Sequence, residues 1–359
     1  MQAQSNKLDF SGQNIYIGFD VHLKSWKVTI MSETLVLKTF SQPPDPKVLH
    51  QYLVSHFPGG IYHSAYEAGF CGYWIHNQLV SLGIKSIVVN PSDIPTTNKE
   101  KVQKEDQRDS RKIARSLKSG DLTAIYVPSE KTLEDRSLLR ARKMLTKDLS
   151  RYKNRIKSFL HFHGIEFPPV FLNPQSHWSK RFVIWLESIP MVHNTGKQSL
   201  LALINESKHL RESLLNVTRQ VRLLSRTEAY QEQAKLLQSV PGIGLITAMT
   251  LLTELETFER FHNLDQLCSL IGLVPSTDSS GDNDKIGDIT PRGHNVLRSA
   301  IIESAWVAAR TDPALLISYN GYCKRMEPNQ AIVRIAKKLL SRVRYVIKNK
   351  QPYVCSVVK

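Results

Sequence analysis

The sequence predicts an α/β domain followed by a mainly α-helical region, so we assign the chain to the class α/β plus all-α. Short β-rich runs alternate with helical patterns through the first 128 residues. Beyond residue 129 the strand signals stop, and leucine and isoleucine recur at near-helical intervals. With 359 residues, of which 41% are hydrophobic, the chain can bury two or three cores, which predicts two or three domains.

Three short β-rich runs open the N-terminal domain after a flexible tail over residues 1–14: IYIGFD, WKVTIM and TLVLKTF. We expect them to form a three-stranded meander. A PPDP turn and a helix over about 46–57 follow. Next come a strand at IYHSAYE, a helix at GYWIHNQLVSLG that ends at Gly83, and a strand at IKSIVVN. This βββαβαβ order is that of a ribonuclease-H-like domain, which we expect over residues 15–128.

Residues 129–230 predict a helical coiled-coil arm. Between residues 131 and 157, ten basic residues against three acidic ones leave a net charge of +7. This imbalance favours an arm that faces nucleic acid or mediates oligomerisation over a merely solvated helix face. A connector over 164–178 and a second long helix over about 196–228 would complete an antiparallel pair.

The C-terminal domain, expected over 231–359, begins with two helical patterns interrupted by VPGIG. Gly242 and Gly244 allow backbone N–H groups to approach a phosphate, which predicts a helix-hairpin-helix-like segment, with a plain interhelical turn as the alternative. A helix at LDQLCSLIGL, the polar loop VPSTDSSGDNDKIGDITPRG and a helix at HNVLRSAIIESAWVAARTD follow. Nine cations and one acid between residues 324 and 350 alternate with apolar residues and predict a helix with one phosphate-facing side.

The chain is strongly basic. Lys and Arg number 48 against 32 Asp and Glu, a formal charge of +16 and a pI of about 9.6, which favours a polyanionic partner such as nucleic acid. The four cysteines are scattered without a CxxC pair. Their spacing argues against a zinc site or a disulfide framework and fits a reducing cytoplasm. We expect no export and no membrane partner, because no apolar leader or stretch of about 18 apolar residues occurs.

Four carboxylates stand at chemically meaningful intervals. Asp20 and Glu67 each lie where an apolar run meets a polar loop, and Asp106 and Asp109 are spaced i, i+3 at the start of a predicted helix. Such an arrangement gathers oxygen ligands at one edge of a sheet, as hard divalent cations require. Together with the basic charge, it predicts metal-assisted phosphodiester chemistry on nucleic acid.

A serine in the polar loop is a further candidate. Ser280 precedes a glycine and is followed by Arg292 and Arg298, so its hydroxyl could act as a nucleophile with cations beside a phosphate. From the residues alone, a turn role is the more frequent one for a loop serine.

Several segments together resemble one family. These are FDVH, YEAGFCGYWIHNQLVSLGI, VNP, KEDQRDSRKIA, LLQSVPGIGLITAMTLLTEL, FERFHNLDQLCSLIGLVPSTDSSG and ITPRGHNVLR. Their order and spacing over about residues 15–310 resemble the insertion-sequence transposases of the IS110 family, DEDD enzymes related to the Piv site-specific DNA invertase. The resemblance implies a RuvC-like N-terminal domain, a helical arm and a C-terminal transposase domain.

The resemblance also implies roles for the acids. Asp20 matches the first family acid, Glu67 the acid of the EA motif, and Asp106 and Asp109 the two acids of KxDxxDA. Ser110 replaces the usual alanine of that motif, a small change that leaves the assignment standing. The set is implied to bind one or two Mg²⁺ ions.

Ser280 matches the serine of the family's SG motif, which makes it the implied nucleophile of a covalent phosphoserine intermediate; Ser279 is the alternative. His294 stands where the family often has asparagine. Because the acids and the serine lie in different domains, the resemblance requires a composite site, within one protomer or across two.

The implied partners are double-stranded donor and target DNA, a structured noncoding guide RNA called a bridge RNA, and further copies of the chain in a homodimer or homotetramer. We expect the charge to hold backbone while base pairing supplies specificity. The residues expected to contact nucleic acid are Lys104, Arg108, Arg140, Arg142, Lys143, Lys147, Arg151, Gly242, Gly244, Arg292, Arg298, Lys337 and Lys338.

Three other functions stay open at this point. A RuvC-like structure-specific nuclease would use the metal site alone. A non-catalytic nucleic-acid-binding protein is disfavoured, because clustered carboxylates repel phosphate unless a metal is present. An actin-like or sugar-kinase-like ATPase is the least favoured function. IGFDVH resembles the first phosphate-binding strand of such enzymes, but no glycine-rich second phosphate loop follows it.

Overall fold

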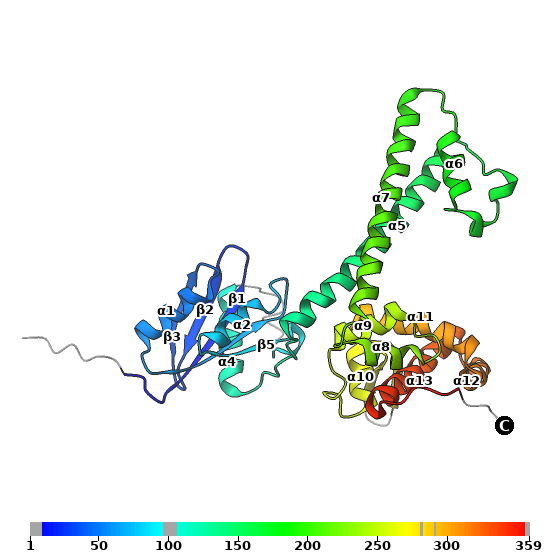
Figure 1. Ribbon diagram of the computed structural model, residues 1–359. Coiled ribbons are helices and arrows are strands. Elements are labelled where there is room, and N and C mark those ends of the chain that lie inside the picture. The colour runs from blue at the N-terminus through cyan, green and yellow to red at the C-terminus, as the bar shows by residue number, and fades with distance from the viewer. Residues whose placement is uncertain (1–8, 96–105, 281–282, 291, 356–359) are drawn as a thin grey trace, which may run out of the picture. The chain divides into compact units, whose positions relative to one another are not determined.

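The computed structural model describes residues 9–95, 106–280, 283–290 and 292–355, and within these ranges the side chains of 106–108, 276–280 and 283–288 fall outside the description. The chain divides into two compact units, residues 1–127 and 128–359 (Figure 1). None of the helices in the described ranges is long and apolar enough to cross a membrane.

The first unit is built on a five-stranded sheet of order β3-β2-β1-β4-β5. The strands are β1 (Asn14–Val21), β2 (Trp26–Met31), β3 (Val36–Gln42), β4 (Ile61–Glu67) and β5 (Lys85–Val89). The first three form the predicted antiparallel meander, and β4 and β5 extend it in parallel with β1. Together with the helices, this mixed sheet is consistent with the expected ribonuclease-H-like domain.

Helices cover both faces of this sheet. The helical elements are α1 (Pro46–His56), α2 (Trp74–Ser81), the short η1 (Pro91–Asp93) and α4 (Asp106–Ser119). One face carries a large core in which strand residues such as Ile17 and Phe19 pack with Leu49 of α1 and Leu79 of α2. On the other face, strand residues such as Ala65 pack with Ile113 of α4 in a smaller cluster. The strand period of two residues separates the two cores.

Helix α4 approaches β1 very closely at Gly18. A Cβ atom on Gly18 would lie 2.2 Å from the backbone nitrogen of Ala114 and 2.4 Å from the backbone oxygen of Ser110. Beside this point, the buried hydroxyls of Ser110 and Thr29 are hydrogen-bonded at 2.9 Å. A glycine in the strand and a small hydroxyl residue in the helix therefore fix where α4 lies on the sheet.

The second unit begins with two long antiparallel helices, α5 (Glu130–Phe162) and α7 (Asn194–Leu224), joined through η2 (Pro169–Phe171), η3 (Pro174–Ser176) and α6 (Lys180–Ser188) (Figure 1). Helices α8 (Gln231–Gln238), α9 (Leu245–Leu255), α10 (Leu264–Ile271), α11 (Asn295–Thr311), α12 (Pro313–Cys323) and α13 (Pro328–Asn349) follow. The predicted long helices, the predicted interruption between α8 and α9 and the final helix α13 are observed; α6 and α12 were not predicted.

One expectation about this unit is wrong. The segment expected to be a polar loop contains the antiparallel strands β6 (Pro275–Ser280) and β7 (Asn283–Ile289). These strands are almost entirely polar, so they lack the alternation of apolar residues by which strands are recognised. The Gly281-Asp282 dipeptide between them is a sequence signal for a two-residue hairpin connection that would have predicted the ribbon.

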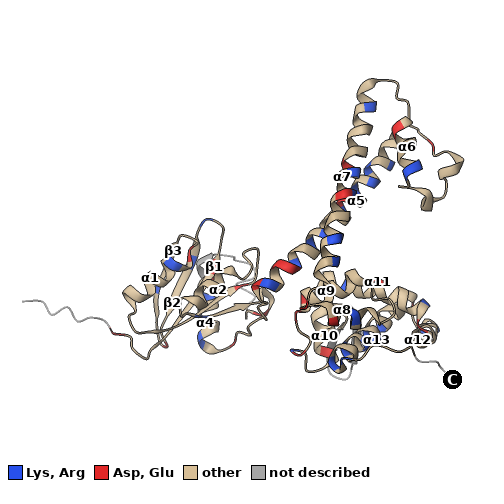
Figure 2. Ribbon diagram, in the orientation of Figure 1, with Lys and Arg blue, Asp and Glu red and all other residues tan. Residues whose placement is uncertain are grey.

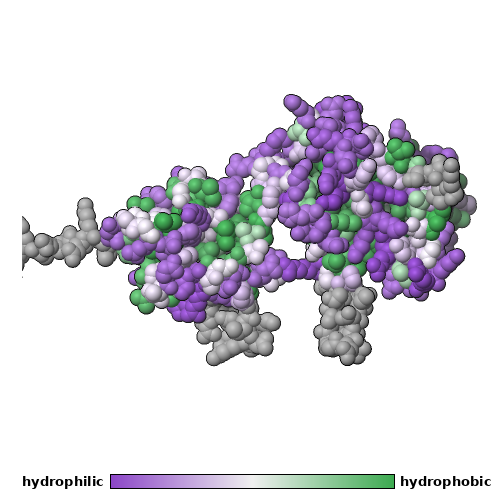
Figure 3. All heavy atoms as spheres, turned by 90° about the horizontal axis from the view of Figure 1, so that it is seen from below, coloured by the Kyte–Doolittle hydropathy of each residue, from purple (hydrophilic) through white to green (hydrophobic). Residues whose placement is uncertain are grey.

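Two cores hold the second unit. Helices α8 to α13 share a large core that includes Leu237, Leu251, Ile301 and Leu339. A separate cluster centred on Phe182 joins the far ends of α5 and α7 to α6. Lys and Arg recur along α5 (Figure 2), and hydrophilic residues cover most of the described surface on the face shown in Figure 3.

We predict that Gly18→Ala destabilises the first unit by about 1–3 kcal/mol, because the methyl group meets the rigid backbone of α4. The measurement is urea unfolding of the full chain. Gly69→Ala is the control, since a Cβ there meets nothing within 4 Å. Equal unfolding free energies for the two variants would contradict the close contact.

Candidate functional site

The strand register brings Asp20 and Glu67 level with each other. In the parallel pair β1 and β4, Phe19 lies opposite Tyr66, so the next residues, Asp20 and Glu67, are neighbours at the carboxyl ends of the strands. The rings of Phe19 and Tyr66 stack at 5.1 Å in the core under α1 and α2. Because successive strand residues alternate between faces, Asp20 and Glu67 lie on the face that α4 covers.

The direction of α4 places its first turn at the same edge. Ser110 lies beside Gly18, whereas Nζ of Lys118 donates a 3.0 Å hydrogen bond to the backbone oxygen of Glu33. The Glu33 carboxylate accepts a 2.7 Å hydrogen bond from Tyr16 near the start of β1. Helix α4 therefore runs opposite to β1, and its N-terminal turn lies toward the end of β1 where Asp20 is found.

Asp106 and Asp109 belong to that N-terminal turn. Asp106 precedes Ser110 by one helical turn, and Asp109 precedes Ile113 by one turn. Because Ser110 and Ile113 contact the sheet, the positions of the two aspartates lie on the sheet-facing side of α4. The structure thus brings Asp20, Glu67 and the two aspartate positions to one edge of one face. The side chain of Asp106 falls outside the described residues.

Carboxylate oxygens at this edge suit a hard divalent cation. Asp20 is 22% exposed and lies 3.0 Å from Nε2 of His22. Among the side chains that the structure describes, no three His, Cys, Asp or Glu groups converge closely enough to hold a metal. The fit to a metal therefore rests on donor chemistry and on the shared edge.

Ser280 is the last residue of β6, opposite Asn283 at the end of the hairpin; its side chain and that of Ser279 fall outside the described residues. Arg298 of α11 fastens the base of this hairpin. Its guanidinium donates to the backbone oxygens of Arg292 (3.0 Å) and Ile271 (3.3 Å), which lie on the two sides of the hairpin. We infer that Arg298 positions the hairpin rather than serving as a free phosphate ligand.

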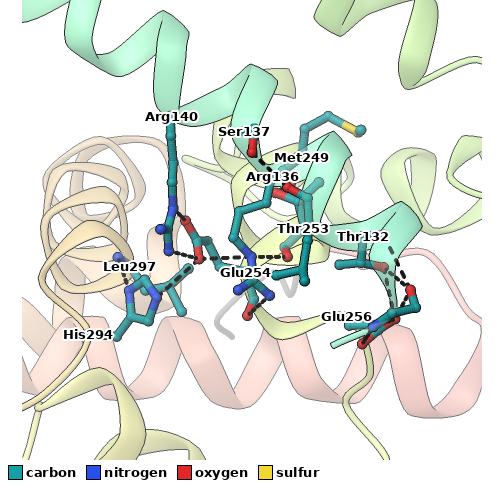
Figure 4. A network of polar contacts seen from close by, with 12 residues as sticks. Thr132, Arg136, Ser137, Arg140, Met249, Thr253, Glu254, Glu256, His294 and Leu297 are labelled. Atoms are coloured by element: carbon teal, nitrogen blue, oxygen red, sulfur yellow. Dashed lines mark hydrogen bonds and ion pairs between the residues drawn. The ribbon is translucent and has the colours of Figure 1, made fainter. Parts of the chain in front are cut away.

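Next to the hairpin base, a buried carboxylate joins three helices (Figure 4). Glu254 of α9 has a side chain only 1% exposed. Arg140 of α5 donates to both of its oxygens at 2.9 Å, Nε of Arg136 lies 3.2 Å away, and Nε2 of His294, at the start of α11, lies 3.2 Å away. Arg136 also donates to the backbone oxygen of Thr253. This network ties the first of the long helices to the helices that carry the hairpin.

The network keeps Glu254 ionised. Burial alone raises the pKa of this carboxyl, but the hydrogen bonds and positive charges of His294 and Arg140 outweigh burial and lower the pKa from 4.5 to about 2. A second glutamate, Glu256, accepts hydrogen bonds from the backbone nitrogen and hydroxyl of Ser129 and from the hydroxyl of Thr132 at the start of α5.

Sequence reasoning missed this network. Glu254 stands near the end of the helix LITAMTLLTEL and is its one charged residue, and an acid at a core position requires a buried cation as its partner. That signal could have marked the position, although not the identity of the partner.

The structure places the predicted nucleic-acid contacts in different settings. Arg140 pairs with Glu254, Arg142 donates to the hydroxyl of Thr218 (3.0 Å), and burial lowers the pKa of Arg142. Arg151 pairs with Asp148 (2.9 Å), and Nζ of Lys338 donates to Ser318 (3.1 Å).

Other predicted contacts lie nearer to solvent. Lys143 and Lys147 line an open groove of about 480 Å³ beside α9. Arg292 is exposed and Lys337 is half-buried on α13. Lys104 and the side chain of Arg108 fall outside the described residues.

The two glycines of the α8–α9 turn have different surroundings. Gly242 has a φ of +86°, and a Cβ there would lie 2.3 Å from the backbone oxygen of Ser304, so its close approach is to α11. Gly244 is exposed with open space around it and is the N-cap of α9, without a capping side chain. Of these two glycines, therefore, only Gly244 lies where a ligand could reach the first backbone N–H groups of α9.

Two family models match this chain. One, described as a transposase and named for the DEDD transposases of the IS110 group, matches residues 17–165. The other, described as the transposase IS116/IS110/IS902 family, matches residues 234–320.

Individual proteins are also similar to it. A putative transposase y4qE of Sinorhizobium fredii is 31% identical over 67% of this chain, and the match spans 57% of that protein. The transposase for insertion sequence element IS1533 of Leptospira borgpetersenii is 25% identical over 82% of this chain and 85% of its own length. The pilin gene-inverting protein of Moraxella bovis is 30% identical over 41% of this chain and 47% of its own length.

We predict that Glu254→Gln removes a pH dependence of stability. Because the folded pKa of about 2 lies below the ordinary 4.5, ionised Glu254 stabilises the fold above pH 4.5 and loses this contribution as the pH falls toward 2. The difference integrates to about 3 kcal/mol. Urea unfolding between pH 7 and pH 3 should show about 2 kcal/mol of this difference, because the folded carboxyl is still mostly ionised at pH 3.

The control for this prediction is Glu232→Gln, which removes one exposed acid from α8. Its unfolding free energy should fall with pH as that of the unmodified chain does. A Glu254→Gln variant with the same pH slope as the unmodified chain would refute the coupling.

Proposed function

This chain belongs to the IS110 family of transposases, enzymes of DNA transposition, and from that premise we propose that it cleaves and exchanges DNA strands through a covalent intermediate on Ser280. The observation that carries the proposal is the pair Asp20 and Glu67, level on adjacent parallel strands, with the first turn of α4 at the same edge. Carboxylates gathered at one edge of a sheet in a basic protein suit metal-assisted phosphodiester chemistry.

We propose that Asp20, Glu67, Asp106 and Asp109 hold one or two Mg²⁺ ions. All four supply oxygen, the ligand that Mg²⁺ prefers, and no softer donor belongs to the set. Bound Mg²⁺ would stabilise the negative charge that develops on the phosphate oxygens during strand cleavage. The protein's own part is to keep the carboxylates in place, through the register of β1 with β4 and the contact of α4 at Gly18.

Ser280 supplies the proposed nucleophile. Its hydroxyl oxygen attacks the scissile phosphorus, a phosphoserine ester forms, and the bond to the departing strand's oxygen breaks, with the serine proton passing to that oxygen or to solvent. A strand hydroxyl from the second duplex then attacks the ester and restores the serine. One phosphate ester replaces another at each step, so no nucleotide cofactor is needed.

The proposed partners follow from charge and from the family. A formal charge of +16 suits double-stranded donor and target DNA. Contacts to the backbone carry no sequence information, so we propose that a structured noncoding guide RNA, a bridge RNA, supplies it by base pairing. Joining two duplexes calls for at least two copies of the chain, as a homodimer or homotetramer.

A second candidate function is that of a RuvC-like structure-specific nuclease. The edge of acids lies entirely within the first unit, so a metal-dependent nuclease would need nothing from Ser280. The hairpin would then be a structural ribbon.

We predict that Ser280→Ala abolishes a covalent protein–DNA adduct and slows strand exchange by at least about a thousandfold, because it removes the attacking oxygen. The measurement uses nicked donor DNA, Mg²⁺ and RNA transcribed from the element, with the adduct mapped by mass spectrometry. Asp20→Asn should lose the adduct as well, because one metal ligand is weakened.

Ser279→Ala is the matched control and should keep both adduct and exchange. Loss of the adduct with Ser279→Ala alone would move the nucleophile by one residue. DNA cleavage that persists in Ser280→Ala without any adduct would overturn the serine mechanism in favour of the nuclease.

A further inference from the structure

A second open groove lies in the second unit where the C-terminal end of α7, helix α8 and the first turn of α9 meet. Its volume is about 470 Å³. We call it the basic groove and define it by three cations: Arg222 in the last turn of α7, Arg226 two residues beyond the end of α7, and Lys235 of α8. Gln231, Gln238 and Leu245 also line it.

The three cations of the basic groove are exposed, and none forms an ion pair or hydrogen bond through its side chain with any residue that the structure describes. This sets them apart from Arg140 and Arg142, which are bound to protein partners. No carboxylate is present among the eight described residues that line the groove. Three positive charges that line one groove repel one another, so an anionic ligand would relieve that repulsion.

The wall of the basic groove at Leu245 adds backbone donors. Leu245 is the first residue of α9, whose N-cap, Gly244, provides no side-chain acceptor. The first N–H groups of a helix lack intrahelical partners, and the helix dipole gives this end a partial positive charge. The next residues of the same turn, Ile246 and Thr247, line the separate groove that contains Lys143 and Lys147. The first turn of α9 thus lies between two sets of cations.

We propose that the basic groove binds the phosphodiester backbone of a DNA duplex, an inference that rests on the proposed strand exchange and names where this unit holds its substrate. The groove has no aromatic residue among its described lining residues, and stacking on aromatic rings is how proteins usually hold single-stranded bases. Its donors are cations, amides and helix N–H groups, which suit phosphate oxygens. A duplex backbone, sequence-independent in its contacts, is the ligand that matches.

The test is the triple variant Arg222→Gln, Arg226→Gln and Lys235→Gln in the full chain. The control, Lys180→Gln, Arg181→Gln and Lys324→Gln, removes the same charge from exposed cations that do not line the groove. Binding of a labelled random-sequence DNA duplex is measured without Mg²⁺ between about 0.05 and 0.3 M salt. A thermal melt of each variant confirms folding.

We expect the groove variant to lower affinity on the order of a hundredfold at about 0.1 M salt and to reduce the slope of log K against log salt by about 2 to 3, because up to three phosphate contacts are lost. The control should change both quantities much less. Equal losses in both variants would reduce the effect to net charge and overturn the site.

A parallel arm replaces the duplex by an RNA stem-loop of equal charge. If the groove variant loses RNA binding and keeps DNA binding, the groove is an RNA site and the DNA assignment is wrong. Because these measurements need neither Mg²⁺ nor Ser280, they remain informative even if the covalent mechanism fails, and a failed groove leaves the Ser280 experiment unaffected.

Discussion

The contact between α4 and β1 at Gly18 is the constraint on which the first unit's site depends. The backbone of α4 lies so close to β1 that no Cβ atom fits between them at Gly18. Helix α4 therefore cannot slide or rotate without losing contact with the sheet. The buried hydrogen bond between the hydroxyls of Ser110 and Thr29 adds a directional constraint to that steric one. Ser110 thereby gains a hydrogen-bond partner inside the sheet.

In the second unit, electrostatic interactions fix the position of a long helix. Its long helix α5 meets α9 through Glu254, whose two oxygens accept from Arg140 in a geometry only an arginine can provide. Apolar contacts alone are non-directional, so they allow a long helix to rotate or shift in register. A buried charge that must be satisfied from fixed directions removes that freedom. His294 extends the same constraint to the start of α11, beside the hairpin whose first strand ends at Ser280.

Much of this could be predicted from sequence. The strands of the meander and the long helices carry strong apolar periods, and strand order places acids at the ends of parallel neighbours. The β6–β7 hairpin was missed because its strands have no apolar alternation. The partners of Arg140 and Arg142 were missed for another reason: counting charge along a helix shows how many cations exist, but only packing decides which of them acquire buried partners.

Those partners divide the cations of the second unit into two kinds. Arg136, Arg140 and Arg298 direct their guanidinium groups at protein oxygens and hold helices and the hairpin in place. The cations of the basic groove have no such partner among the described residues. Removing the first kind should damage the fold, whereas removing the second should change salt-dependent binding and leave stability intact. The number of cations on a basic helix therefore predicts a nucleic-acid surface poorly. Only the cations without partners inside the protein should be counted.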